Sequence, residues 1–128
     1  MNKTIFATGI LFGTLAILLG AFGAHGLKQL VDANAVQTFE TGVTYQMYHA
    51  LFLLLLGSVK QIPTKSKRVV FCLIVLGVVF FSFSIYGLAT NTLTSFDFKS
   101  IAFITPIGGV LLMSGWILLG YRVFKQFN

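Results

Sequence analysis

The sequence has 128 residues, of which 56% are hydrophobic and only 9% are charged, and it contains 14 Phe. A soluble domain of this size has too little interior to hide so much apolar surface, so the composition excludes an ordinary soluble globule and predicts an integral membrane protein. The net charge of +6 does not indicate a nucleic-acid partner, because the basic residues stand between apolar runs without interleaved aromatic residues.

Four apolar segments approach the ~20 residues that cross a bilayer, and they cover residues 5–24, 43–59, 69–89 and 101–123. We therefore expect an all-α membrane protein whose residues 1–128 form one domain, a four-helix transmembrane bundle. A secretory signal peptide is the alternative for the first segment, but three further spans follow it, so we expect the segment to be retained.

Residues 27–41, between the first two spans, carry apolar side chains at spacings of three and four residues. This spacing predicts a short helical segment on the outer side of the membrane. The segment either lies along the outer surface or extends the second span outward.

The positions of Lys and Arg predict the orientation of the spans. Seven of the nine basic residues occur near the N-terminus, between the second and third spans, and near the C-terminus, which share one side if there are four spans. The opposite side has only Lys28 and Lys99, together with the acidic residues Asp32, Glu40 and Asp97. We therefore expect a multi-pass protein of the cell (plasma) membrane with both termini in the cytoplasm.

The first span has a narrow stripe of small residues, which predicts close backbone approach to another helix. The stripe consists of Gly9, Gly13, Ala16, Gly20 and Ala24. It is either the seam of a homodimer or a packing face within the bundle, and we favour packing because the chain already offers partner helices. Gly108 and Gly115 serve similarly in the fourth span. We expect replacement by Leu to matter less at Gly57 than at Gly13.

Polar side chains within spans are costly and therefore mark candidates for function. With the predicted topology they gather in the outer half of the bundle, so a site there would open outward. The candidates for ligand or partner contact are His25, Glu40, Tyr45, Gln46, His49, Ser84, Tyr86 and Thr105.

An ideal helix places Gln46 and His49 on one face of the second span and Glu40 on another. An acid–base pair would therefore join His25 with Glu40, or His49 with a group from another helix. The side chain of His49 is either a proton relay or ligand contact, or a neutral imidazole bonded to Ser, Thr or Tyr across the bundle. We favour the neutral imidazole.

We expect no metal and no cofactor. A haem held by two His needs ligands at similar depth, whereas His25 is at the outer boundary and His49 lies deeper. The single Cys72 has no partner for a metal cage or a disulfide. The sequence also lacks a carboxylate in a span core, a nucleophile elbow and a phosphate loop, so we expect the protein not to be an enzyme.

Three segments resemble a known family across essentially the whole chain. They are GAFGAHGL at 20–27, FETGVTYQMYHAL at 39–51, and ITPIGG at 104–109 followed by Gly115-Trp116. They resemble the YgdD/YwdK-like bacterial membrane family, a domain of unknown function with related small transmembrane proteins in eukaryotes. The resemblance implies four spans in a bacterial inner membrane and no known activity. One departure is Phe83, where the family tends to have a small residue between two serines.

Our leading hypothesis is a non-enzymatic membrane protein, surrounded by lipid, that acts as an accessory or assembly partner in a larger membrane complex or as a homo-oligomer. The alternative is a small oligomeric transporter or channel that binds a solute or lipid headgroup in the outward-facing polar cluster. A third hypothesis is an enzyme or cofactor binder that uses His25 or His49.

Overall fold

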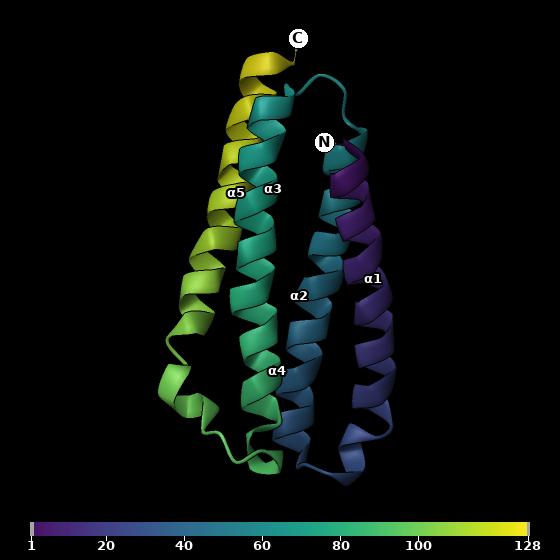
Figure 1. Cartoon of the computed structure of the whole chain (residues 1–128), viewed down its shortest axis with the longest axis vertical. Helices are drawn as coiled ribbons and strands as arrows, with labels where there is room; N and C mark the ends of the chain where they lie inside the picture. Colours follow the sequence, from purple (N-terminus) through teal and green to yellow (C-terminus); the bar gives the residue numbers. More distant parts are fainter. Residues whose placement is uncertain (1, 128) are drawn as a thin grey trace.

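A computed structural model describes residues 2–127, and within this range it contains helices and turns but no strand. The expectation of an all-α protein is confirmed. The four long helices are α1 (Asn2–Ala24), α2 (Ala33–Ser58), α3 (Thr64–Val78) and α5 (Ile104–Gln126). They run alternately up and down the molecule (Figure 1). The helix that begins with α3 continues through a π-helical turn, η2 (Val79–Phe83), into α4 (Ser84–Ala89).

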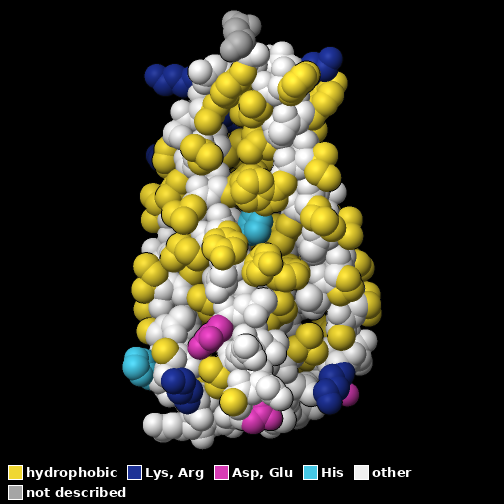
Figure 2. Space-filling view, turned by 180° about the vertical axis from the view of Figure 1, so that it is seen from behind, with side chains coloured by type: hydrophobic (Ala, Val, Ile, Leu, Met, Phe, Trp, Pro, Cys, Tyr) yellow, Lys and Arg dark blue, Asp and Glu magenta, His cyan; other side chains and the backbone are white. Residues whose placement is uncertain are grey.

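The two ends of the molecule differ in charge. The N-terminus, the α2–α3 connection and the C-terminus lie at one end (Figure 1), which we call the basic end. Its cations are Lys3, Lys60, Lys65, Lys67, Arg68, Arg122 and Lys125. The opposite, mixed end has the α1–α2 and α4–α5 connections, with two Lys and all three acidic residues of the chain. In Figure 2 the acidic side chains are visible only toward this end.

Three helical stretches are long and apolar enough to cross a membrane: Asn2–Gln29, Thr64–Ala89 and Ile104–Gln126. Helix α2 is not among them. Its 26 residues are long enough, but its first half exposes polar side chains that lower its hydropathy. The predicted segment 27–41 forms the 3-10 turn η1 (Leu27–Gln29) and then extends α2 outward. Asp32 caps α2 because its carboxylate accepts a hydrogen bond from the Ala35 N–H at 2.8 Å.

By backbone proximity the helices follow the order α1, α2, α3 with α4, and α5, and the Trp116 side chain of α5 also reaches His49 of α2. Helix α1 contacts mainly α2, and α5 contacts mainly α3 and η2, so the chain consists of two antiparallel hairpins. The hairpins meet chiefly where α2 contacts α4. Toward the basic end the two hairpins diverge (Figure 1).

The small-residue stripe of α1 lies against α2, inside the protein. A Cβ atom on Gly9 would lie 3.0 Å from the carbonyl oxygen of Ala50, and one on Gly20 would lie 3.4 Å from Val43 Cγ1. Ala16 is buried between them. The stripe therefore packs α1 against its own neighbour and is not free to form a dimer seam.

The tightest glycine contacts of the first hairpin differ from those expected. A Cβ atom on Gly57 would lie 3.0 Å from the ring of Phe6, whereas one on Gly13 would lie 3.6 Å from the nearest atom, in Ala50. The expected ranking, in which Gly57 matters less than Gly13, is therefore reversed. At the mixed end Gly23 is buried against Phe39, while Ala24 is only partly buried.

Glycines also set the distance between α5 and the α3–α4 helix. A Cβ atom on Gly108 would overlap the backbone nitrogen of Phe81 in η2, and one on Gly115 would lie 2.7 Å from the Ile74 side chain. A backbone atom cannot move aside as the end of a side chain can. Gly108 therefore fixes how closely α5 approaches the π-helical turn.

We predict that Gly108→Ala lowers the free energy of unfolding by ~1–3 kcal/mol, because the added methyl group forces α5 away from η2. Thermal unfolding in detergent measures this effect. The matched control is Gly120→Ala, since a Cβ atom there meets nothing within 4 Å and Ala favours the helix. Equal melting temperatures for the two variants would contradict the prediction.

Candidate functional site

Two serines, Ser82 in the π-helical turn η2 and Ser84 at the start of α4, bond to helices on different sides. Ser82 is fully buried, and its hydroxyl donates to the Gly42 carbonyl of α2 at 2.8 Å. The hydroxyl of Ser84 lies 2.6 Å from that of Thr105 in α5. A π-helical turn inserts a residue and shifts the helix face that follows it, and such turns often occur at functional sites. Here the turn links α2 and α5 through one short segment.

Ser84 also satisfies the backbone of the turn. Its hydroxyl oxygen lies 2.5 Å from the Phe80 carbonyl and 2.9 Å from the Phe81 carbonyl. A hydroxyl has a single hydrogen and two lone pairs. When Ser84 donates to a carbonyl, Thr105 therefore donates to Ser84, and the two hydroxyls form a chain that ends on the backbone.

Gln46 joins three helices. It is fully buried, and its amide Nε2 donates to the Phe12 carbonyl of α1 at 2.8 Å. Its Oε1 accepts from the hydroxyl of Tyr86 in α4 at 2.6 Å. A Cβ atom on Gly42 would lie 2.7 Å from the Tyr86 ring, so this glycine lets the ring lie against α2. Both ends of the Gln46 amide are thus satisfied away from water.

His49 connects α2 with α5. The indole nitrogen of Trp116 lies 3.0 Å from His49 Nε2, and His49 Nδ1 lies 2.6 Å from the Tyr45 carbonyl. An indole N–H can only donate, so Nε2 accepts and the hydrogen-bond pattern assigns the imidazole proton to Nδ1. The partner from another helix is therefore Trp116, and not the Ser, Thr or Tyr expected from the sequence.

We call these bonded side chains the interhelical network. Its members are Gln46, His49, Ser82, Ser84, Tyr86, Thr105 and Trp116. Within residues 2–127, Arg122 Nε is the only buried side-chain nitrogen or oxygen that lacks a hydrogen-bond partner. All buried polar atoms of the network are therefore satisfied, and the arrangement is suited to holding helices together in lipid.

The predicted candidates do not converge on one outward-facing cluster. His25 and Glu40 are exposed and take no part in the network. Tyr45 is 40% exposed, and its ring contacts Phe81. Ser82 and Trp116 belong to the network but were not among the candidates predicted from the sequence. The available signal was the single Trp in a span, whose N–H needs an acceptor.

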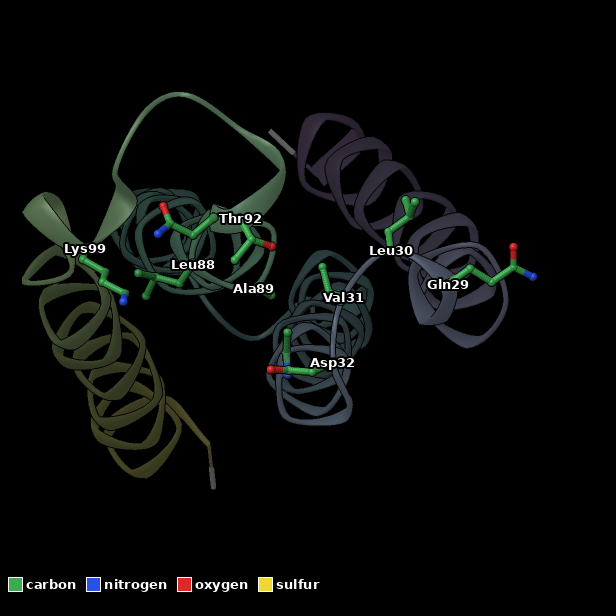
Figure 3. Close-up of a pocket in the computed structure, with 10 residues that line it drawn as sticks. Gln29, Leu30, Val31, Asp32, Leu88, Ala89, Thr92 and Lys99 are labelled. Atoms are coloured by element: carbon green, nitrogen blue, oxygen red, sulfur yellow. The ribbon is translucent and has the colours of Figure 1, made fainter.

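A pocket of about 510 Å³ opens at the mixed end between the two hairpins, and none of the predicted candidates lines it. Val31 and Asp32 stand on one side, and Leu88, Thr92 and Lys99 stand on the other (Figure 3). The Asp32 carboxylate is already engaged in capping α2. This opening is therefore separate from the interhelical network.

A smaller hollow of about 270 Å³, which we call the lateral groove, lies between α2 and α5. It is lined by Tyr45, His49, Phe81, Gly109, Leu112, Met113 and Trp116. Figure 2 shows a histidine at mid-height on one face, surrounded by hydrophobic side chains. Both ring nitrogens of His49 are already bonded, so the groove presents a mainly apolar surface. Within residues 2–127, no three His, Cys, Asp or Glu side chains are placed to share a metal ion.

The chain is similar to membrane proteins of unknown function. The family described as "Protein of unknown function (DUF423)" matches residues 19–109. A UPF0382 membrane protein of Staphylococcus saprophyticus is 40% identical over 96% of this chain and 98% of its own length. One from Staphylococcus aureus is 38% identical over 96% and 97%, and one from Haemophilus influenzae is 37% identical over 91% and 90%. No solved structure matches the chain.

We predict that Tyr86→Phe lowers the free energy of unfolding in detergent by ~0.6–2 kcal/mol, the range for an interhelical hydrogen bond in a membrane protein. The cause is the loss of the bond to Gln46 Oε1. Tyr48→Phe is the matched control, because Tyr48 is 57% exposed. In a Gln46→Leu background the Tyr86→Phe change should cost less. Equal costs of Tyr86→Phe in both backgrounds would show that the two side chains are not coupled.

Proposed function

The chain belongs to the DUF423 family of proteins of unknown function, and from that premise we propose a non-enzymatic role. The protein acts as an accessory or assembly partner within a larger membrane complex, or as a homo-oligomer. Its relatives are named membrane proteins, and its own sequence has three helical stretches apolar enough to cross a membrane. Its polar side chains bond to one another between its helices, so they are engaged in holding the fold.

The observation that carries this proposal is the position of α1 at one edge of the molecule. There α1 has one main neighbour, α2, and its side turned away from α2 is available to lipid or to another protein. Apolar surface alone does not drive association in lipid, so a partner must find close packing or a polar contact. The exposed side of α1 offers both.

We call this side of α1 the α1 outer face, and its pattern of small and large residues repeats every seven positions. It consists of Ala7, Ile10, Leu11, Thr14, Ile17, Leu18 and Ala21, all exposed. A small residue at every seventh position lets a second helix approach closely, and the large residues three and four positions later fill the space beside it. Thr14 adds a hydroxyl in the middle of this face. The face is opposite the glycine stripe that packs on α2.

We further propose that α2 also spans the membrane, which gives four spans. The chain ends near residues 2 and 127 lie at the same end of the molecule (Figure 1). Three crossings would leave the ends of the chain on opposite sides of the membrane, whereas four return them to one side. Helix α2 lies beside α1 over most of its length, from Gly57 against Phe6 to Phe39 against Gly23, which supports the same conclusion.

The orientation that we propose has both termini in the cytoplasm, in a bacterial inner membrane. Its support is the distribution of charge, because the basic end carries seven of the nine Lys and Arg. Positive residues next to a span are retained on the cytoplasmic side during insertion.

We predict that single Cys residues report this topology in a Cys72→Ser background, since Cys72 is itself exposed. A maleimide that cannot cross membranes should label Gln29→Cys and Ser100→Cys in intact cells. The same reagent should label Gln61→Cys only after the membrane is opened. Labelling of all three from one side would contradict four spans.

We predict that Thr14→Cys, in a Cys72→Ser background, forms a disulfide cross-link to the same residue of a second copy when an oxidant is added to native membranes. Thr14→Leu should reduce the same complex in native mass spectrometry, because Leu separates the packed helices. Ile117→Cys is the control, since Ile117 is 72% exposed on α5 and outside the α1 outer face.

A monomer without a co-purifying protein, and without a cross-link at Thr14, would contradict the assembly proposal.

A further inference from the structure

We propose that a pocket at the basic end binds the phosphate group of an anionic phospholipid. The pocket has a volume of about 470 Å³ and lies between the start of α3 and the end of α5. Sites for small molecules in proteins typically measure ~300–1,000 Å³. The site is independent of the α1 outer face and of the proposed assembly role.

The lining of the pocket combines two cations with other hydrogen-bonding groups and an apolar wall. Lys65 and Ser66 come from α3, Arg122 and Gln126 come from α5, and Val69 and Leu118 form the apolar wall. The two cations thus approach one space from different helices. An anion placed between them would contact both α3 and α5.

Arg122 supplies the most specific sign of a missing partner. Its Nε is buried, yet no acceptor within residues 2–127 bonds to it. A buried donor without an acceptor is rare in folded proteins, and each one calls for an explanation. The planar guanidinium presents its N–H groups as a fork that fits two oxygens of one phosphate. A phosphate in the pocket would satisfy this nitrogen.

The start of α3 provides further donors. Pro63 precedes the helix and offers no side-chain cap, and the first backbone N–H bonded to a carbonyl is that of Lys67, which bonds to Pro63. The earlier N–H groups of the first turn therefore lack acceptors within the helix. The N-terminal end of a helix is electropositive and favours phosphate oxygens.

The protein supplies no acidic side chain to neutralise these groups. Asp32, Glu40 and Asp97 are the only acidic residues of the chain, and all three belong to the mixed end. An external anion can supply the counter-charge that the basic side chains of the pocket lack.

The apolar wall indicates that this anion belongs to a lipid. Val69 is 47% exposed. From Val69 the apolar side of α3 leads away from the pocket toward the middle of the molecule. A phospholipid can place its phosphate between Lys65 and Arg122 and its acyl chains along Val69 and Leu118. Anionic lipids are also the anions that basic groups at a membrane surface attract. A free phosphate ion would leave the apolar wall without a partner.

The test uses delipidated full-length protein in detergent, titrated with phosphatidylglycerol or phosphatidylcholine and examined by native mass spectrometry. The parent protein should retain phosphatidylglycerol in preference to phosphatidylcholine. The double variant Lys65→Gln, Arg122→Gln should bind phosphatidylglycerol about tenfold more weakly, because it loses charge-assisted hydrogen bonds. Arg122→Lys, which keeps the charge but loses the fork, should also bind more weakly than the parent.

The matched control is the double variant Lys60→Gln, Lys125→Gln, which removes the same charge from the same end at positions outside the pocket. It should retain phosphatidylglycerol as the parent does. Equal losses in both double variants would show diffuse attraction without a site and would overturn the proposal. A separate titration with inorganic phosphate distinguishes the two sources of the group. Displacement of the lipid by an equal concentration of phosphate would overturn the assignment to a lipid.

Discussion

An apolar interior offers no hydrogen-bond partner to a polar side chain other than those the protein itself supplies, and this constraint governs how the four helices are joined. Gln46 meets it most completely, because both ends of its amide bond to other helices. Helix α2 is therefore the helix that contacts all the others. It carries polar side chains on its buried face that would be destabilising without hydrogen-bond partners, and α1 and α4 provide those partners.

Close packing and hydrogen bonding depend on each other in this structure. The Ser82 hydroxyl reaches the Gly42 carbonyl, and the absence of a side chain at Gly42 lets Tyr86 approach Gln46. On the other side of η2, Gly108 lies against the backbone of the turn, and this brings Thr105 within reach of Ser84. Glycines thus set the helix separations at which short polar side chains can bond.

The sequence was sufficient to predict the helices and the face of α2 that turns inward. Gln46 and His49 are buried and Glu40 is exposed, as a projection at 100° per residue indicates. The same projection could not foresee the π-helical turn, because an inserted residue shifts the register of the residues that follow. It also could not identify Trp116 as the partner of His49, since spacing along one helix does not specify which residue of another helix lies opposite. The function of the candidate residues stays a prediction.

The division into two hairpins has a consequence for biosynthesis. The glycine contacts between α1 and α2 join residues of the first 57 positions, so this hairpin can assemble before the second hairpin has left the ribosome. The amide nitrogen of Gln46 can then donate to the Phe12 carbonyl at once, while its oxygen has no donor until Tyr86 is in place. The amide's bonding is complete when the second hairpin packs against the first and brings Tyr86 to it. The hairpin of α1 and α2 therefore has an unsatisfied acceptor, Gln46 Oε1, until the second hairpin arrives. This acceptor favours pairing with Tyr86 of α4.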